Sequence, residues 1–126
     1  MELCSSPNIV QYHFTYYYLQ TLFMFIEFMD AGSLTGFIRQ YKKKIPERII
    51  AYILKGVLKG LCAIHSHHQI HRDVKSDNIM LNKNGQIKIA DFGYAMQLTA
   101  EKGVAKGLAG TAAWMAPELI RKEDYD

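Results

Sequence analysis

Apolar and aromatic residues fill two short runs near the start of the chain, 9–18 and 21–28, separated only by Leu19 and Gln20. Both runs are rich in the β-branched and aromatic residues that favour strands. Two such runs with a short connection predict an antiparallel hairpin. A surface for stacking nucleic-acid bases would need interleaved Arg or Lys, and neither run contains one. We therefore expect these aromatic side chains to be buried in strands.

The strongest helical pattern follows Pro46. Gly56 and Gly60 lie inside it, and each weakens a helix by roughly 0.5–1 kcal/mol relative to alanine. We expect them to permit close packing against a neighbouring element. A shorter helix is predicted over 34–41, with Ser33 as its N-cap. The long helix presents one apolar face at helical spacing, made of Ile50, Ile53, Leu54, Val57, Leu58, Leu61 and Ile64.

After residue 68 the helical pattern ends. Short apolar runs at 79–81 and 86–89 flank Asn84-Gly85, a pair that suits a hairpin turn. The segment 93–113 is rich in Gly, Ala, Lys and Thr without a sustained period, which predicts a long loop, and such loops are usually functional or disordered. Strands thus precede a long helix, which precedes a second hairpin. This order predicts an α+β fold rather than a doubly wound sheet.

Composition restricts the classes of function. The 126 residues are 49% hydrophobic, which is typical of one globular domain. The formal charge of +3 is too weak to indicate a nucleic-acid partner. Cys4 and Cys62 show no CxxC pattern, and the first residues carry no signal peptide. The apolar stretch 22–29 is far shorter than the roughly 20 residues of a membrane span. We expect a soluble cytoplasmic protein with no membrane span.

Ionisable side chains cluster at 71–78, HRDVKSDN, between two apolar runs. Charges in such a place cost desolvation energy unless they are paired, solvated or bound to a ligand. The second hairpin leads to Asp91, so it should bring Asp73, Asn78 and Asp91 together. Two carboxylates and an amide oxygen are ligands that Mg²⁺ takes beside phosphates. With Lys75 as a neutralising cation, the cluster predicts phosphoryl transfer.

Three motifs in order, HRDVKSDN (71–78), DFG (91–93) and APE (116–118), resemble the catalytic-loop, metal-binding and activation-segment motifs of eukaryotic protein kinases. Lys75 and the Gly-Thr pair at 110–111 resemble the serine/threonine rather than the tyrosine kinases. The sequence GTAAWMAPE is most similar to the STE group near the PAK-type kinases, and the mixed-lineage kinases are the alternative.

The resemblance implies a partial protein-kinase fold, with the end of the N-lobe sheet and the hinge over 1–29 and the first part of the C-lobe over 30–126. It implies transfer of phosphate from ATP, with Mg²⁺, to Ser/Thr hydroxyls of protein substrates. The Gly-rich loop, the ATP-positioning lysine and its glutamate partner have no counterpart in these residues, so we expect the isolated chain to be inactive. The alternative is a non-catalytic fragment that acts as an interaction module with a regulatory protein partner.

Each matching position acquires a role by this resemblance. Asp73 would accept or orient the proton of the substrate hydroxyl, and Lys75 would contact the γ-phosphate. Asn78 and Asp91 would hold Mg²⁺. The simpler structural interpretation makes Asn78 and Asp91 a cap and a turn residue.

The nucleotide site follows in the same way. Glu27 and Met29 would lie in the hinge beside adenine, and Met80 would lie under the ring. His71 and Phe92 would stack in the spine that aligns the two lobes. The resemblance also assigns places in the site to Tyr12, Ile26 and Thr111.

Two further patterns lie near the ionisable cluster. The histidines of HSHHQIH at 65–71 lack a Cys or acidic partner at zinc-like spacing, so a zinc site is disfavoured.

Arg72 precedes Asp73 as in kinases whose phosphorylated loop docks onto an arginine. However, 100–110 contains no Ser, Thr or Tyr, and Gly107 occupies the PAK-type phosphothreonine position. We expect Arg72 to have another partner or to remain solvated, and the loop to be ordered by packing, a partner protein or Glu101. The alternative is a sequence error or local misalignment.

Overall fold

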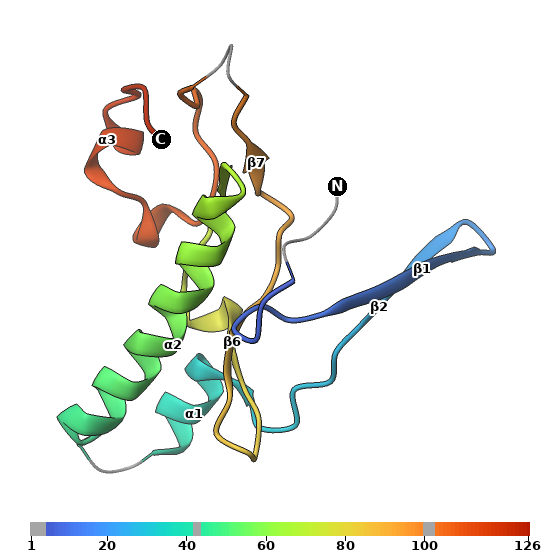
Figure 1. Ribbon diagram of the computed structural model, residues 1–126, viewed down its shortest axis with the longest axis vertical. Coiled ribbons are helices and arrows are strands. Elements are labelled where there is room, and N and C mark those ends of the chain that lie inside the picture. Colours follow the sequence, from blue (N-terminus) through green and yellow to red (C-terminus); the bar gives the residue numbers. More distant parts are fainter. Residues whose placement is uncertain (1–4, 42–43, 100–102) are drawn as a thin grey trace.

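The structure is a computed structural model that describes residues 5–41, 44–99 and 103–126. It combines small sheets with helices, which confirms the predicted α+β class (Figure 1). The strands are β1 (Tyr12–Tyr18), β2 (Thr21–Ile26), β3 (Gly32–Ser33), β4 (Gln69–Ile70), β5 (Ile79–Leu81), β6 (Ile87–Ile89) and β7 (Met96–Gln97). The helices are α1 (Leu34–Gln40), α2 (Glu47–Ser66) and α3 (Pro117–Ile120), with 3₁₀ turns at Ser76–Asn78 and Ala112–Trp114.

The predicted first hairpin is confirmed. Strands β1 and β2 pair antiparallel, with Tyr18 opposite Thr21. Leu19 and Gln20 form the turn at φ 44° and 60°. The expected burial of its aromatic residues is wrong, however, because Tyr17 is 66% exposed and the strands are exposed along nearly their whole length. The hairpin projects away from the helices (Figure 1), and within the described residues no layer packs over its faces.

The core lies between α2 and β6, and the two glycines of α2 permit the contact. A Cβ at Gly56 would lie 2.6 Å from Cβ of Ile87. One at Gly60 would lie 2.7 Å from the carbonyl oxygen of Asn8 and 2.8 Å from Cδ1 of Ile89. The close packing predicted for these glycines is therefore confirmed. The buried core consists of Ile9, Ile53, Val57, Ile64, Ile79, Leu81, Ile87 and Ile89.

Part of the predicted apolar face of α2 is uncovered. Ile50, Leu54 and Leu58 are 44%, 53% and 60% exposed. By length and composition alone α2 could cross a membrane. This is weak evidence, since a core helix passes the same test, and Ile53 and Ile64 of α2 are packed in the core.

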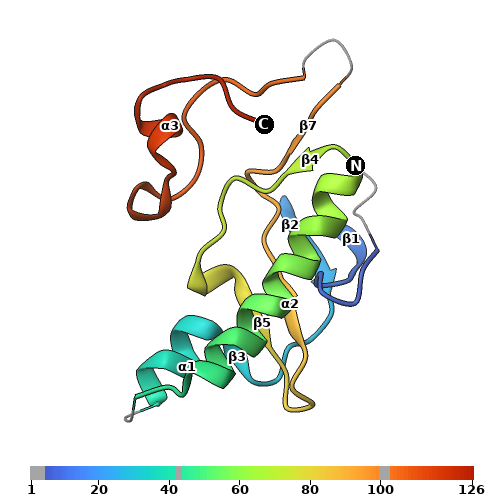
Figure 2. The ribbon, with the colours of Figure 1, turned by 60° about the vertical axis from the view of Figure 1, so that its left-hand side comes forward.

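The second hairpin is also confirmed, and it carries a third strand that the sequence did not predict. Strands β5 and β6 pair antiparallel, and Gly85 has a φ of 79° at their turn. Strand β3 pairs with the other edge of β5. Ser33 at its end caps α1, as predicted, by accepting a hydrogen bond of 3.2 Å from the amide of Gly36. Helices α1 and α2 lie close together beside this sheet (Figure 2).

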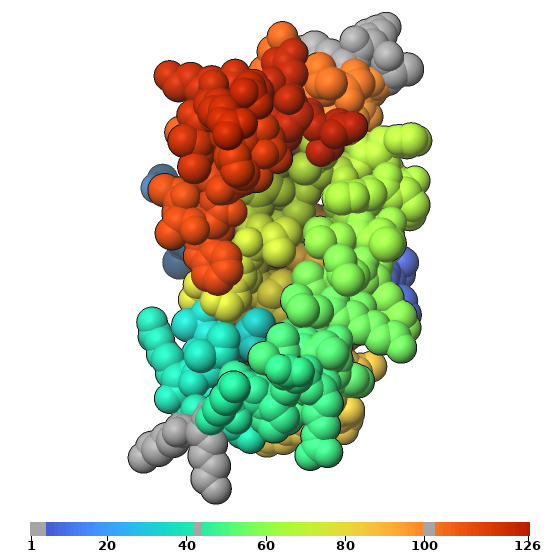
Figure 3. Space-filling view, turned by 90° about the vertical axis from the view of Figure 1, so that its left-hand side faces the viewer, coloured from blue at the N-terminus to red at the C-terminus, as the bar shows by residue number. Residues whose placement is uncertain are grey.

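The segment 93–113 is mostly irregular, as predicted, but it contains two unpredicted backbone pairings. Strand β7 pairs with β4, and Ala105 pairs with Tyr125. Both partners are distant along the chain, so no local periodicity indicates them. The C-terminal residues gather at one end of the molecule (Figure 3).

Candidate active site

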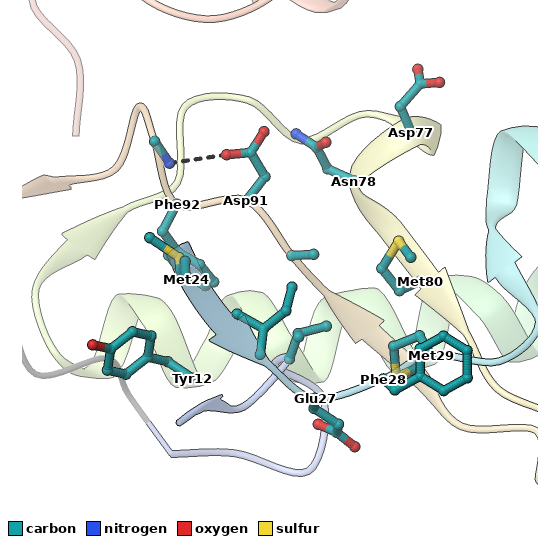
Figure 4. Close-up of a pocket in the computed structure, with 14 residues that line it drawn as sticks. Tyr12, Met24, Glu27, Phe28, Met29, Asp77, Asn78, Met80, Asp91 and Phe92 are labelled. Atoms are coloured by element: carbon teal, nitrogen blue, oxygen red, sulfur yellow. Dashed lines mark hydrogen bonds between the residues drawn. The ribbon is translucent and has the colours of Figure 1, made fainter. Parts of the chain in front are cut away.

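A cavity of about 880 Å³ opens between the first hairpin and the β5–β6 hairpin. Its volume lies in the range of about 300–1,000 Å³ that small-molecule sites occupy. Tyr12, Met24 and Met80 contribute apolar walls, whereas Asn78 and Asp91 lie together at one polar edge (Figure 4). The cavity can therefore take a flat apolar group with a charged group at that edge.

The segment that joins β2 to β3 forms another wall of this cavity. Met29 is buried, and the side chain of Glu27 forms an ion pair with Lys88 of β6 at 2.6 and 2.8 Å. Burial raises the pKa of Glu27, but the hydrogen bonds from Lys88 and from the amide of Gln11, together with the charge of Lys88, outweigh this effect and leave the pKa lowered. The pair fastens this segment to the sheet. Sequence analysis missed it, since 61 positions separate the two residues.

Asp73 is 2% exposed and is surrounded by donors. Its Oδ1 accepts hydrogen bonds from the backbone amide and the hydroxyl of Thr111, at 2.9 and 2.6 Å. Its Oδ2 accepts from Lys75 Nζ at 2.7 Å and from Asn78 Nδ2 at 3.1 Å. Burial raises the pKa of Asp73, but the hydrogen bonds from Lys75 and Thr111 leave it below its usual range. Asp73 is thus an ionised carboxylate at neutral pH.

Lys75 completes this cluster. Its ammonium also donates to the hydroxyl of Thr111 at 2.7 Å. The hydrogen bond with Asp73 raises the pKa of Lys75, so the side chain stays protonated. A fixed positive charge beside a fixed carboxylate can serve a reaction in which a proton leaves and negative charge develops nearby.

Asn78 and Asp91 supply the oxygen atoms that a divalent cation would need. Asn78 Nδ2 donates to the backbone carbonyl of Asp73 at 3.0 Å as well as to its carboxylate, which fixes the orientation of the amide. Asp91 has a φ of 63° and accepts from the amide of Gly93 at 3.1 Å. In the described part of the chain no three His, Cys, Asp or Glu side chains gather around a point. The pair fits Mg²⁺, which takes few protein oxygens together with water and phosphate.

His71 connects the backbone at Asp73 to the backbone at Ala90, directly after β6. It is 1% exposed, its Nε2 donates to the carbonyl of Ala90 at 3.0 Å, and its Nδ1 accepts from the amide of Asp73. Its ring meets the edge of Phe92 at a centroid distance of 5.0 Å. Burial lowers the pKa of His71, which agrees with this neutral form. The ring therefore supports the backbone on both sides of the site.

Arg72 adopts a φ of 65°, a conformation that is uncommon for a residue with a side chain. Its Nε donates to the carbonyl of Tyr94 at 2.6 Å, and its Nη1 donates to the hydroxyl of Tyr125 at 3.4 Å. Arg72 therefore has partners of its own, one of the two outcomes that the sequence left open. Sequence analysis missed Tyr125, and no local pattern marks it.

The comparisons with known proteins agree with this geometry. Residues 1–126 match the protein kinase domain family along their whole length. The chain is 48% identical to serine/threonine-protein kinase pakB of Dictyostelium discoideum, covering 100% of this chain and 15% of pakB. It is 47% identical to pakC (99% and 27% covered) and 38% identical to fray2 (100% and 12% covered), both from the same organism.

The chain thus spans between 12% and 27% of the length of these relatives. The predicted resemblance to PAK-type kinases is confirmed by the similarity to pakB and pakC. Since the family match includes every residue, the chain belongs to the protein kinase domain family.

Proposed function

We propose that the protein carrying this chain is a serine/threonine protein kinase that transfers the γ-phosphoryl group of ATP to hydroxyl groups of protein substrates. The observation that carries the proposal is the buried carboxylate of Asp73, held 2.7 Å from the ammonium of Lys75 and hydrogen-bonded to Asn78, which lines the large cavity. The names of pakB and pakC as serine/threonine-protein kinases support the same substrate class.

Asp73 accepts and orients the proton of the attacking hydroxyl, because it is an ionised acceptor whose position is fixed by four hydrogen bonds. Lys75 offsets the negative charge that develops on the transferring group. Its ammonium bridges Asp73 and Thr111, so little reorganisation is needed when that charge develops. Asn78 and Asp91 would hold Mg²⁺, which would supply positive charge to neutralise phosphate oxygens.

The nucleotide base occupies the apolar part of the cavity. Met29 and Met80 contact it, and Glu27 belongs to the hinge that the base meets. The ion pair between Glu27 and Lys88 keeps that hinge fixed on β6, so the backbone beside the base is preorganised. We place the protein in the cytoplasm, with protein substrates and a regulatory protein partner.

A second candidate function is a non-catalytic interaction module. The exposed apolar residues of the β1–β2 hairpin favour it, because large exposed apolar patches mark interaction surfaces. Mutation of an exposed hairpin residue outside the cavity, such as Tyr17, would then change binding to other proteins without any effect on phosphate transfer.

The experiment compares the full-length protein with Asp73→Asn and Asp91→Asn variants in transfer of labelled phosphate to a Ser/Thr peptide. Both variants should lose nearly all activity, and Asp91→Asn should lose more Mg²⁺-dependent nucleotide affinity. Glu47→Gln removes a carboxylate from the first turn of α2 and should leave activity unchanged. The proposal would be refuted if Asp73→Asn retained phosphate-transfer activity, or if the wild type showed none.

A further inference from the structure

Tyr125 is buried although it lies next to the exposed residues Asp124 and Asp126. It is 8% exposed, and its backbone forms a reciprocal pair with Ala105: the amide of Ala105 donates to Tyr125 at 2.6 Å, and the amide of Tyr125 donates back at 3.2 Å. Ala105 has no exposed surface. The end of the chain is therefore fixed to the segment that leads towards Thr111 (Figures 1 and 2).

The hydroxyl of Tyr125 makes a second connection. It donates to the carbonyl of Gly107 at 3.0 Å and accepts from Nη1 of Arg72 at 3.4 Å. One phenol group thus joins the irregular segment at Gly107 to the catalytic loop at Arg72. A tyrosine that served only to fill space would not need its hydroxyl placed between two polar partners.

Arg72 transmits this connection to the active site because it directly precedes Asp73. Its carbonyl oxygen also lies against Gly110, where an added Cβ would overlap with it. The next residue, Thr111, donates two hydrogen bonds to Asp73. The segment 103–111 is therefore held at two points, by Tyr125 near its middle and by Asp73 at its end.

Phosphorylation has no acceptor over most of this segment, since 100–110 contains no Ser, Thr or Tyr. The guanidinium of Arg72 instead donates to two neutral oxygens, the carbonyl of Tyr94 and the hydroxyl of Tyr125. An exposed ion pair between Lys106 and Asp124 at 3.0 Å links the same two stretches of chain. Surface pairs of this kind contribute little, so the buried hydroxyl is the stronger connection.

We infer that Tyr125 is a positioning residue of the active site, whose hydroxyl links Arg72 to Gly107 and holds the segment 103–111 so that Thr111 contacts Asp73 without phosphorylation of that segment. The inference rests on the proposed kinase function and specifies how the site is regulated. Tyr125 contacts neither substrate nor nucleotide and acts only through Arg72 and the segment.

The test compares Tyr125→Phe with wild type in the full-length protein. The substitution removes the hydroxyl and keeps the ring and the backbone pair. Loss of its two hydrogen bonds should lower kcat/KM for a Ser/Thr peptide about tenfold. Tyr52→Phe is the matched control, because its hydroxyl also donates to a carbonyl, that of Gly85 at 2.7 Å, far from the site. That control should keep wild-type activity.

Two measurements separate positioning from general stabilisation. In an Arg72→Met background, Tyr125→Phe should have no further effect on kcat/KM, because the link is already broken. Hydrogen exchange should become faster at the amides of Ala105 and Thr111 in Tyr125→Phe, and the thermal midpoint should fall no further than it does in Tyr52→Phe. Phosphatase treatment should leave the wild-type activity unchanged.

The inference would be overturned if Tyr125→Phe kept both the activity and the hydrogen-exchange rates of the wild type. The inference would also be overturned if the effects of Tyr125→Phe and Arg72→Met on kcat/KM were fully additive. The same holds if phosphatase treatment caused a loss of activity that is traced to a phosphosite within 94–111. The two proposals can fail separately: a wild type that is active and depends on Asp73, with no effect at Tyr125, contradicts only the positioning role. A wild type without transfer activity contradicts the kinase function, whereas the exchange measurement still tests the contact.

Discussion

Gly110 is a position where a single methyl group should damage the candidate active site. Its φ is 107°, and an added Cβ would overlap with the carbonyl oxygen of Arg72. A residue with a side chain in so unusual a conformation costs about 1–3 kcal/mol. Overpacking against a fixed neighbour costs about 1–3 kcal/mol more. Arg72 cannot move aside freely, because its own side chain is bonded to Tyr94 and Tyr125.

Gly110→Ala should therefore introduce about 2–6 kcal/mol of strain beside the site. The hydrogen bonds that Thr111 donates to Asp73 have a charged acceptor, and such bonds are worth about 1.5–3 kcal/mol each. The two quantities are similar, so withdrawal of Thr111 from Asp73 is the cheapest relief. A loss of 2 kcal/mol in transition-state stabilisation corresponds to about a 30-fold lower kcat/KM, and we expect at least that.

Steady-state transfer of labelled phosphate to a Ser/Thr peptide measures the effect, and two nearby glycines serve as controls. Gly107 has a φ of 96° and no atom within 4 Å of an added Cβ, so Gly107→Ala introduces strain without a clash. Gly103 also has open space and no positive φ, so Gly103→Ala should stay within about twofold of wild type. If Gly110→Ala were as active as Gly103→Ala, the reasoning about the close contact would be wrong.

Three further outcomes follow from the fold. Gly60→Ala should lower the free energy of unfolding in urea by about 1–3 kcal/mol, because its Cβ would lie 2.7 Å from the carbonyl oxygen of Asn8, whereas Gly36→Ala, with 3.7 Å of clearance, should raise it by about 0.5–1 kcal/mol. Since burial lowers the pKa of His71, the unfolded protein binds a proton below about pH 6.5 that the folded protein does not. The free energy of unfolding should therefore fall as the pH drops through this range. Urea titrations at several pH values should show that His71→Gln makes this fall less steep. Residues 1–126 alone should show no phosphate transfer above background, because positioning supplies most of the catalysis; sustained transfer that Asp73→Asn abolishes would contradict this.

The elements with local causes could be predicted from the sequence. The first hairpin follows from two strand-forming runs and a two-residue turn, and α2 follows from its apolar spacing. Ser33 caps α1 because a hydroxyl next to a helix start can accept from a free backbone amide. The role of Gly60 could be inferred because glycine inside a strong helical pattern has a cost that close packing offsets.

Features that depend on distant parts of the chain could not be predicted. Whether an apolar strand is buried depends on which other layer packs against it, so the aromatic content of 12–18 indicated a strand but not its exposure. The same limit applies to the contact of Glu27 with Lys88 and to the contact of Arg72 with Tyr125, 53 positions apart. A charge or a phenol in the sequence does not indicate its partner.

The division between local and distant contacts also shows which part of the candidate site depends on the rest of the fold. Asp73, Lys75 and Asn78 lie within six consecutive positions, and a single 3₁₀ turn at Ser76–Asn78 places them relative to one another. Thr111 is the distant member of the cluster, 38 positions from Asp73. Its place depends on a segment that is irregular and is held by contacts from other parts of the chain. We therefore expect changes in those contacts to displace Thr111 from Asp73, while the three clustered residues keep their geometry.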